Sequence, residues 1–415
     1  MLHSPFSGGV ELLSPAGNFE CLAAAAQGGA DAVYFGVGNL NMRARSANNF
    51  SPDDLARVTD FCRRRHIRSY LTVNTVLYDD ELDEMRRIID LAKQAGVSAI
   101  IASDMAAVNY ARRQGMEVHI STQLNLTNIE AVRFYAQFAD VVVLSRELAL
   151  DKVKKIYSQI MAEPVKGPHG KPVRIELFCH GALCMAVSGK CYLSLHEYNA
   201  SANRGACYQI CRRGYTVTDN ETGRQLAIDN QYIMSPKDLC TVGFLDKLLN
   251  AGVRILKIEG RARSADYVQT VTACYRRAID AFLAGDYTPQ LAEQLTATLK
   301  TVFNRGFWDG YYQGARLGEW SEVYGNKATE RKEYIGKATN YFNRLGVAEF
   351  LIETGELSIG DEVLIIGPTT GVVRKTVTEI RVELQAVAKA VKGDACSIAI
   401  PGKIRRADKL YKVVH

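Results

Sequence analysis

Five of the ten cysteines in this 415-residue chain lie between positions 179 and 211. Four of them, Cys184, Cys191, Cys207 and Cys211, stand in glycine-containing or polar turns rather than in apolar runs. Short spacers of this kind let thiolates converge on one point. The chain shows no export signal, so we interpret the group as ligands of a metal or an iron–sulfur centre rather than as disulfides. Spacing alone leaves zinc and iron–sulfur both open.

The other cysteines have simpler interpretations. Most alternate into apolar faces of expected helices or strands and are predicted to be small core residues: Cys21, Cys62, Cys179, Cys274 and Cys396. Cys240, which follows the cysteine-rich segment, is the candidate substitute if one of the four is not a ligand.

Eight short apolar segments alternate with amphipathic helical stretches along the first three quarters of the chain. The segments begin at Val10, Ala32, Ser69, Ala99, Glu117, Val141, Arg174 and Arg254. This alternation predicts an α/β fold with a TIM-like (β/α)8 barrel over residues 1–331. A cysteine-rich insertion at about 181–235 follows strand seven. Insertions after a barrel strand lie at its carboxyl end, so the cysteines should roof the mouth of the barrel.

Polar residues at the carboxyl ends of barrel strands are the first candidates for chemistry. Lys257, Glu259 and Arg261 share one side of the eighth strand, where the two cations could bind a carboxylate-bearing donor or an RNA phosphate. Glu259 could equally serve only to neutralise a cation. His180 lies beside the cysteines and could carry a proton, although a hydrogen-bonded structural histidine is the simpler interpretation. These four residues form the expected catalytic set.

Further polar residues follow other strands. The amides of Gln123 and Asn125 could read the edge of a pyrimidine, although Asn125 could serve only as a helix cap. Arg146, after the sixth strand, could bind an anion. The expected substrate-binding set is Arg43, Asn74, Gln123, Asn125, Arg146 and Glu176.

The C-terminal part of the chain and the overall composition limit the kinds of partner that we expect. Alternating residues and glycine turns predict a small β-barrel domain over 332–415, in which the basic run KIRRADK, 403–409, could hold the body of an RNA. The net charge of +6 is compatible with RNA without requiring it.

No long apolar run is present, so no membrane span is expected and the cytoplasm is the expected compartment.

The cysteine segment resembles a known family, peptidase family U32. The resemblance rests on Glu176, Phe178, Gly181, Ala182, Cys184, Gly189, Cys191 and Ser194, and on the stretches ELLSPAG, GGADAVYFG, STQLN, VVLSREL, NRGACYQIC, YIMSPKDL and LKIEGRARS. These motifs span nearly the whole expected barrel. Within the family, the chain is most similar to the tRNA hydroxylation proteins.

The resemblance implies a 4Fe-4S cluster held by Cys184, Cys191, Cys207 and Cys211. It also implies oxygen-independent hydroxylation of the wobble uridine in the tRNA anticodon loop to 5-hydroxyuridine, with prephenate as the small organic hydroxyl donor. One alternative is a peptidase, as the family's older label collagenase-like protease suggests, although the sequence has neither an H-E-x-x-H nor a G-x-S-x-G motif. The others are a hydroxylase of a small aromatic such as a quinone precursor, and a zinc-stapled RNA-binding protein without catalysis.

Overall fold

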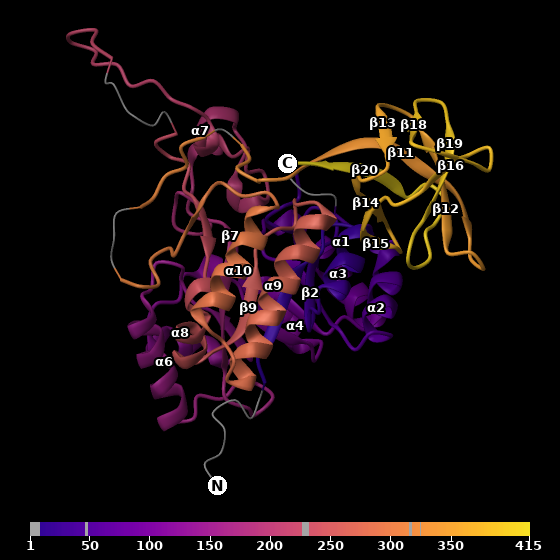
Figure 1. Ribbon diagram of the computed structural model, residues 1–415. Coiled ribbons are helices and arrows are strands. Elements are labelled where there is room, and N and C mark those ends of the chain that lie inside the picture. Colours follow the sequence, from indigo (N-terminus) through magenta and orange to yellow (C-terminus); the bar gives the residue numbers. More distant parts are fainter. Residues whose placement is uncertain (1–8, 46–48, 226–231, 315–317, 324) are drawn as a thin grey trace.

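Eight parallel strands close into a barrel in the computed structural model, which describes residues 9–45, 49–225, 232–314, 318–323 and 325–415 (Figure 1). The barrel strands are β1 (Glu11–Pro15), β2 (Ala32–Gly36), β3 (Arg68–Val73), β4 (Ala99–Ala102), β5 (Glu117–Ile120), β6 (Val141–Val143), β7 (Arg174–Ala182) and β9 (Val253–Ile258). The barrel closes because β9 pairs in parallel with both β1 and β7. The TIM-like fold predicted from the sequence is confirmed, and each strand begins within one residue of its expected start.

Helices lie on the outside of the barrel, and all but the last two connect successive strands. They are α1 (Phe19–Gln27), α2 (Leu55–Arg63), α3 (Leu82–Ala95), α4 (Met105–Arg113), α5 (Ile129–Ala136), α6 (Leu150–Ala162), α8 (Leu245–Asn250), α9 (Ala265–Ala284) and α10 (Pro289–Lys300). The side chains of Asn18, Asp104 and Asn128 accept backbone N–H groups at the starts of α1, α4 and α5. Gly96 ends α3 in the left-handed conformation that glycine adopts most readily.

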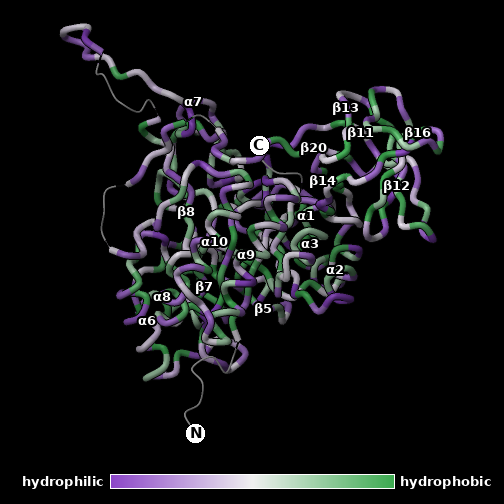
Figure 2. Tube along the Cα trace, viewed as in Figure 1, coloured by the Kyte–Doolittle hydropathy of each residue, from purple (hydrophilic) through white to green (hydrophobic). Residues whose placement is uncertain are grey.

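Side chains from alternate strands fill the barrel in layers. The layer nearest the amino ends is a ring of four charges, Glu11, Arg68, Glu117 and Arg174, one from each odd-numbered strand. Each arginine lies within 3.6 Å of both glutamates. Above this ring, apolar and aromatic residues that include Ala32, Tyr34, Tyr70 and Ile101 form a separate buried cluster. Figure 2 shows apolar residues running through the barrel strands and polar residues along the outer helices.

The cysteine-rich insertion follows β7 and contains the short helix α7 (Leu193–Tyr198). It returns through β8 (Asp238–Cys240), which runs antiparallel to β7 and pairs with β10 (Phe307–Trp308). Arg204 anchors the insertion to the loop after β3, because its two terminal nitrogens each lie 2.8 Å from a carboxylate oxygen of Glu81. The insertion therefore covers the carboxyl end of the barrel, as predicted.

Antiparallel strands make up the C-terminal part of the chain. They are β11 (Arg331–Phe342), β12 (Val347–Ile352), β13 (Glu356–Ser358), β14 (Glu362–Gly367), β15 (Gly371–Thr376), β16 (Ile380–Val382), β17 (Gln385–Val387), β18 (Lys389–Val391), β19 (Ala395–Ala399) and β20 (Lys409–Val414). They enclose their own apolar cluster.

Helix α1 and strand β15 join the two parts of the molecule. The Gln27 amide donates to the Thr370 carbonyl at 2.8 Å and accepts the Val372 N–H at 2.9 Å. Lys332 also pairs with Asp266 at the start of α9. No helix within the described residues is both long and apolar enough to cross a membrane.

Candidate active site

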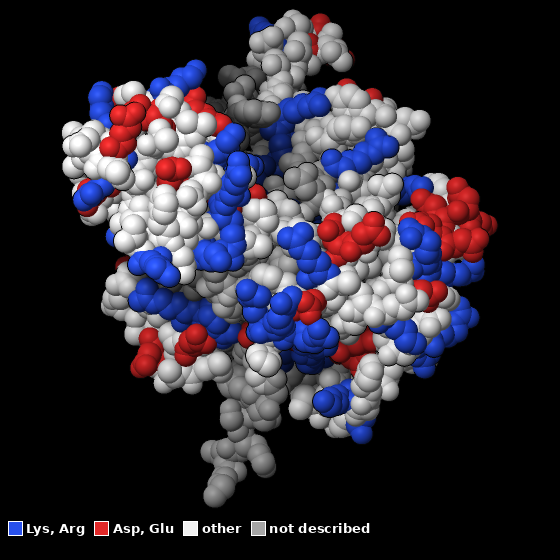
Figure 3. All heavy atoms as spheres, turned by 90° about the vertical axis from the view of Figure 1, so that its right-hand side faces the viewer, with Lys and Arg blue, Asp and Glu red and all other residues white. Residues whose placement is uncertain are grey.

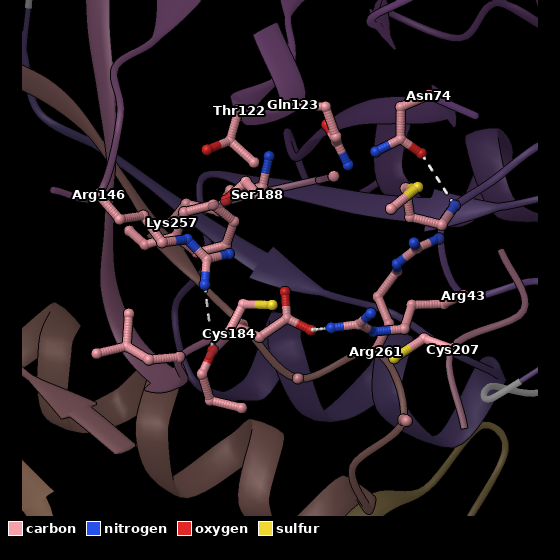
Figure 4. A pocket seen from close by; sticks show the side chains of 18 of the residues that line it. Arg43, Asn74, Thr122, Gln123, Arg146, Cys184, Ser188, Cys207, Lys257 and Arg261 are labelled. Atoms are coloured by element: carbon pink, nitrogen blue, oxygen red, sulfur yellow. Dashed lines mark hydrogen bonds and ion pairs between the residues drawn. The ribbon is translucent and has the colours of Figure 1, made fainter. Parts of the chain in front are cut away.

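A pocket lies at the carboxyl end of the barrel, beneath the cysteine-rich insertion (Figure 4). Its walls come from the ends of β2, β3, β5, β6, β7 and β9 and from the insertion. Ten of the residues expected from the sequence line it: Arg43, Asn74, Gln123, Arg146, Cys184, Cys207, Cys211, Lys257, Glu259 and Arg261. Residues far apart in the chain thus converge on one cavity.

The four expected cysteine ligands are neighbours. The pKa of Cys211 is raised to about 11, mainly by burial; Arg212 opposes the increase, and negative charge on Cys184, Cys207 and Cys191 adds to it. Burial raises the pKa of Cys191 as well, and charge on Cys184 and Cys207 acts in the same direction. Cys191 itself is not among the residues that line the pocket.

Cys240, the candidate substitute, belongs to a different environment. It lies on β8, and charge on it acts on the buried Cys179, Cys274 and Tyr275. The geometry therefore favours Cys211 as the fourth member of the group. The remaining cysteines, Cys21, Cys62, Cys179, Cys274 and Cys396, are buried as predicted.

The sulfur donors are of the type that binds either zinc or an iron–sulfur cluster. Within the described ranges, no three His, Cys, Asp or Glu side chains are arranged to hold a single metal ion. Four cysteines around one zinc would each need their sulfur about 2.3 Å from the metal. Thiolates around a cluster bind different iron atoms and stand further apart. Cys184, Cys191, Cys207 and Cys211 are the residues that could hold such a group.

The pocket is strongly cationic. Seven basic side chains line it against one carboxylate, that of Glu259; the basic residues are Arg43, Arg146, Arg212, Lys257, Arg261, Arg263 and Arg305. Arg43 pairs with Glu259 at 2.9 Å. Burial opposes ionisation of Glu259, but Arg43, Arg146 and Arg261 outweigh it and lower its pKa to about 2. Lys257 and Arg305 pair with Glu176 and Asp238, which do not line the pocket, and the other four cations pair with no carboxylate among the described residues, so they remain available to a ligand.

Arg261 is buried and hydrogen-bonded to neutral oxygens. It is only 5% exposed, and its guanidinium donates to the neutral oxygens of Asn41 and Thr72, each at 2.9 Å. Among the described residues no carboxylate pairs with it, and burial lowers its pKa to about 10. Gly36 makes room for this arrangement, because a Cβ there would lie 2.7 Å from a terminal nitrogen of Arg261. A buried cation without a carboxylate fits an anionic ligand.

Two buried polar atoms in the wall lack a hydrogen-bond partner within the described part of the chain. They are the Thr122 hydroxyl and the Nε of Arg146, whose guanidinium lies 3.8 Å from the ring centre of Phe178. Close by, the Asn74 amide donates to the Ser121 hydroxyl, which in turn donates to Gln123. Buried polar groups normally have partners, so this wall suits a ligand with several donors and acceptors.

Besides Cys191, three expected residues do not line the pocket, and each has a structural role. The β7–β9 register shifts between Phe178 and His180, so His180 turns away from the barrel axis. It packs against Tyr275 and Phe307, and burial lowers its pKa to about 3. The Asn125 amide donates to the carbonyls of Gln123 and Ser188, which ties the insertion to β5. Glu176 lies beneath the pocket and pairs with Lys257 at 2.7 Å.

Several lining residues were missed by the sequence interpretation. They are Tyr34, Met42, Thr72, Thr122, Gln209, Arg263 and Arg305. Arg263 lies in the motif GRARS, two residues after the expected Arg261, and a further lining residue, Arg212, follows the expected Cys211 in CRRGY. Their positions beside expected site residues indicated that they could line the pocket. Gln209 has a φ of 53°, a left-handed conformation that is uncommon for a residue with a side chain.

Comparison with known proteins finds one family model and several relatives that match most of the chain. The family model described as Peptidase family U32 matches residues 17–322. The chain is 60% identical over 402 residues to a protein named collagenase from Porphyromonas gingivalis, covering 97% of each. It is 36% identical to the 23S rRNA 5-hydroxycytidine C2501 synthase of Escherichia coli, covering 75% of this chain and 46% of that protein. It is 32% identical to tRNA hydroxylation protein P1 of Bacillus subtilis, covering 86% of this chain and 83% of that protein.

Proposed function

The chain belongs to peptidase family U32, and from that premise we propose that it is an iron–sulfur enzyme that hydroxylates a pyrimidine base of RNA without molecular oxygen. The observation that carries the proposal is the meeting of four cysteines and seven basic side chains at one barrel mouth. Thiolates supply the ligands of a redox cofactor, and the cations supply sites for anionic substrates.

The substrate we propose is the wobble uridine of tRNA, converted to 5-hydroxyuridine. The names of two relatives specify RNA hydroxylation, and one of them specifies position 5 of a pyrimidine. The chain covers 83% of the tRNA relative but only 46% of the rRNA relative, which favours tRNA. In the pocket, the amides of Asn74 and Gln123 lie on one wall, where they can pair with the edge of a flipped base.

The proposed hydroxyl donor is prephenate, a dicarboxylate. Arg261 and Arg146 provide guanidinium groups for two carboxylates, and neither forms an ion pair with a carboxylate in the described part of the chain. The overall exchange converts donor C–OH and base C5–H into donor C–H and base C5–OH. Two electrons therefore pass from base to donor, and the atoms balance without another oxidant.

A bound 4Fe-4S cluster would supply electron transfer or Lewis-acid chemistry at this mouth. The residues of the chain have separate tasks. Arg146 and Arg261 hold the donor, Arg43 holds Glu259 ionised beside it, and the insertion forms one wall of the cavity. Glu259 is the one carboxylate among the described lining residues, and it could accept the proton released from C5.

The C-terminal sheet gives the body of the RNA a cationic surface. Lys403, Arg405, Arg406 and Lys409, the basic residues of the run KIRRADK, are all exposed and so are accessible to an RNA. Figure 3 views the molecule from the side on which this sheet lies, and Lys and Arg side chains gather there in broad patches and inside a recess. Such contacts position a nucleic acid without reading its sequence.

Two measurements test the proposal. Anaerobic purification followed by iron and sulfide counting should give about four of each per chain. Mass spectrometry of tRNA nucleosides from a strain that lacks the protein should show loss of 5-hydroxyuridine, restored by the intact chain and not by Cys207→Ser. Zinc without acid-labile sulfide would refute the cofactor, and unchanged tRNA would refute the substrate. Loss of 5-hydroxycytidine from rRNA instead would assign the reaction to the other RNA class.

Peptidase activity is the second candidate, because the relative named collagenase is 60% identical to this chain. The pocket gives it little support. Among the described lining residues there is no histidine to act as a base, and burial raises the pKa of the Cys211 thiol rather than lowering it as a nucleophile requires. Gelatin cleavage by metal-free protein that survives Cys184→Ala would favour an independent peptidase.

A further inference from the structure

The outer rim of the pocket carries exposed aromatic side chains. Three of the seven aromatic residues that are exposed among the described residues fall within 192–208: Tyr192, Tyr198 and Tyr208, which are 74%, 45% and 48% exposed. Folding does not require aromatic rings in water, and their gathering on one short segment indicates a binding surface.

Tyr198 and Tyr208 lie side by side. Their ring centres are 5.2 Å apart with an interplanar angle of 51°. The rings are held from both sides, because Arg213 donates to the Tyr198 hydroxyl at 2.8 Å and Arg45 donates to the Tyr208 hydroxyl at 3.4 Å. The two rings and two guanidinium groups form one surface, which we call the tyrosine platform.

The platform adjoins the pocket. Tyr208 stands between Cys207 and Gln209, both of which line the cavity, and its backbone N–H is fixed by the Ser194 hydroxyl at 3.0 Å. Arg45 belongs to the loop after β2, and its N–H donates to the carbonyl of Gly205 in the insertion. A polymer whose target unit entered the pocket would pass over these rings.

We propose that the tyrosine platform stacks the unpaired bases that flank the target nucleotide of a single-stranded RNA loop. Every base has a π-face, so aromatic rings bind loops with little dependence on sequence, and the two arginines match the phosphates between the bases. The platform would thus select RNA whose bases are already unstacked over paired RNA. The inference rests on the proposed RNA substrate and adds to it the structural feature that is recognised.

The test compares the binding of two RNAs by the full chain, purified anaerobically. A synthetic RNA stem–loop and a blunt duplex of the same total length are labelled and titrated by fluorescence anisotropy. Tyr198→Ala and Tyr208→Ala should each weaken stem–loop binding about tenfold and leave duplex binding unchanged. Tyr198→Phe and Tyr208→Phe keep the ring and should bind like the parent chain. Phe134→Ala removes an aromatic side chain of similar exposure, 52%, from α5 and should have no effect.

The possible outcomes separate this inference from the proposed reaction. Iron is counted in each variant, and if Tyr208→Ala loses iron because of its place beside Cys207, Tyr198→Ala carries the test. Equal weakening for stem–loop and duplex, or none for either, overturns the platform. Gelatin binding that depends on both tyrosines, without RNA binding, would assign the surface to peptides and also overturn it. If the stem–loop preference holds while no modified nucleoside forms, the platform stands and the reaction fails.

Discussion

Lys257 and Glu176 form a buried ion pair at the floor of the pocket, with Nζ 2.7 Å from Oε1. The other oxygen of Glu176 faces His119 at 3.8 Å, and His119 contacts Glu117 at 3.0 Å. Positive and negative groups therefore alternate along the barrel axis from the charged ring at the amino ends to the pocket. Charges so buried persist only when each has a partner.

Glu176→Gln should destabilise the protein strongly, because it leaves Lys257 buried without its counter-ion. The expected loss is about 3–5 kcal/mol of unfolding free energy, measured by anaerobic denaturant unfolding. Replacing both residues, as Glu176→Gln with Lys257→Met, should recover part of the loss. A single Glu176→Gln variant as stable as the parent would show that the pair does not carry its charge in the folded state.

Arg261→Met should weaken binding of the dicarboxylate donor while the protein still folds and binds iron. Loss of a charged hydrogen-bonding partner costs about 1.5–3 kcal/mol, so KM for the donor should rise by roughly ten- to hundredfold. Arg63→Met, at a side chain 81% exposed on α2, is the matched control and should leave KM unchanged. An unchanged KM for Arg261→Met would place the donor elsewhere in the pocket.

Stability should fall steeply in acid. Burial opposes ionisation of Glu176, but Lys257 and His119 outweigh it and lower the pKa to about 2. A carboxyl group whose pKa is lower in the folded than in the unfolded protein stabilises the fold fully above its unfolded pKa, near 4.5. This stabilisation is lost as pH falls toward 2. Unfolding free energies measured at intervals across this window should therefore decrease, and the Glu176→Gln variant should show a shallower decrease.

Titration of His119 should make the stability depend on pH in the opposite direction. Burial would lower its pKa, but the carboxylates of Glu117 and Glu176 outweigh burial and raise it above 6.5. A raised histidine pKa stabilises the protein fully below the unfolded value and loses that contribution as pH rises through the folded value. His119→Gln should remove this loss on the alkaline side. Identical pH profiles for the variant and the parent would show that the imidazole is neutral throughout.

The barrel was predictable because its signals are local: apolar strands bounded by turns, and glycines that end helices. The same local information indicated Lys257, Glu259 and Arg261, which lie at the end of β9 and directly after it and line one pocket. For His180 the simpler, structural interpretation is confirmed: a register shift in β7 reverses the side that parity assigns, and the Tyr275 hydroxyl lies 3.4 Å from its Nδ1. The local information missed Arg305, which follows α10 and reaches the pocket only through the closed fold. Contacts between distant segments are not encoded in the spacing of either one.

The cysteines allow the sharpest comparison. Cys207→Ser and Cys211→Ser should each lose most of the iron, sulfide and brown colour, because both thiols line the pocket among the other members of the group. Cys240→Ser is the matched control. The Cys240 thiol lies on β8, near Cys179 and Cys274, so its replacement should leave the iron content unchanged. Iron and sulfide counts on the three anaerobically purified variants decide the matter. Loss of iron from Cys240→Ser with retention in Cys211→Ser would exchange their roles and require the insertion to rearrange when the cluster binds.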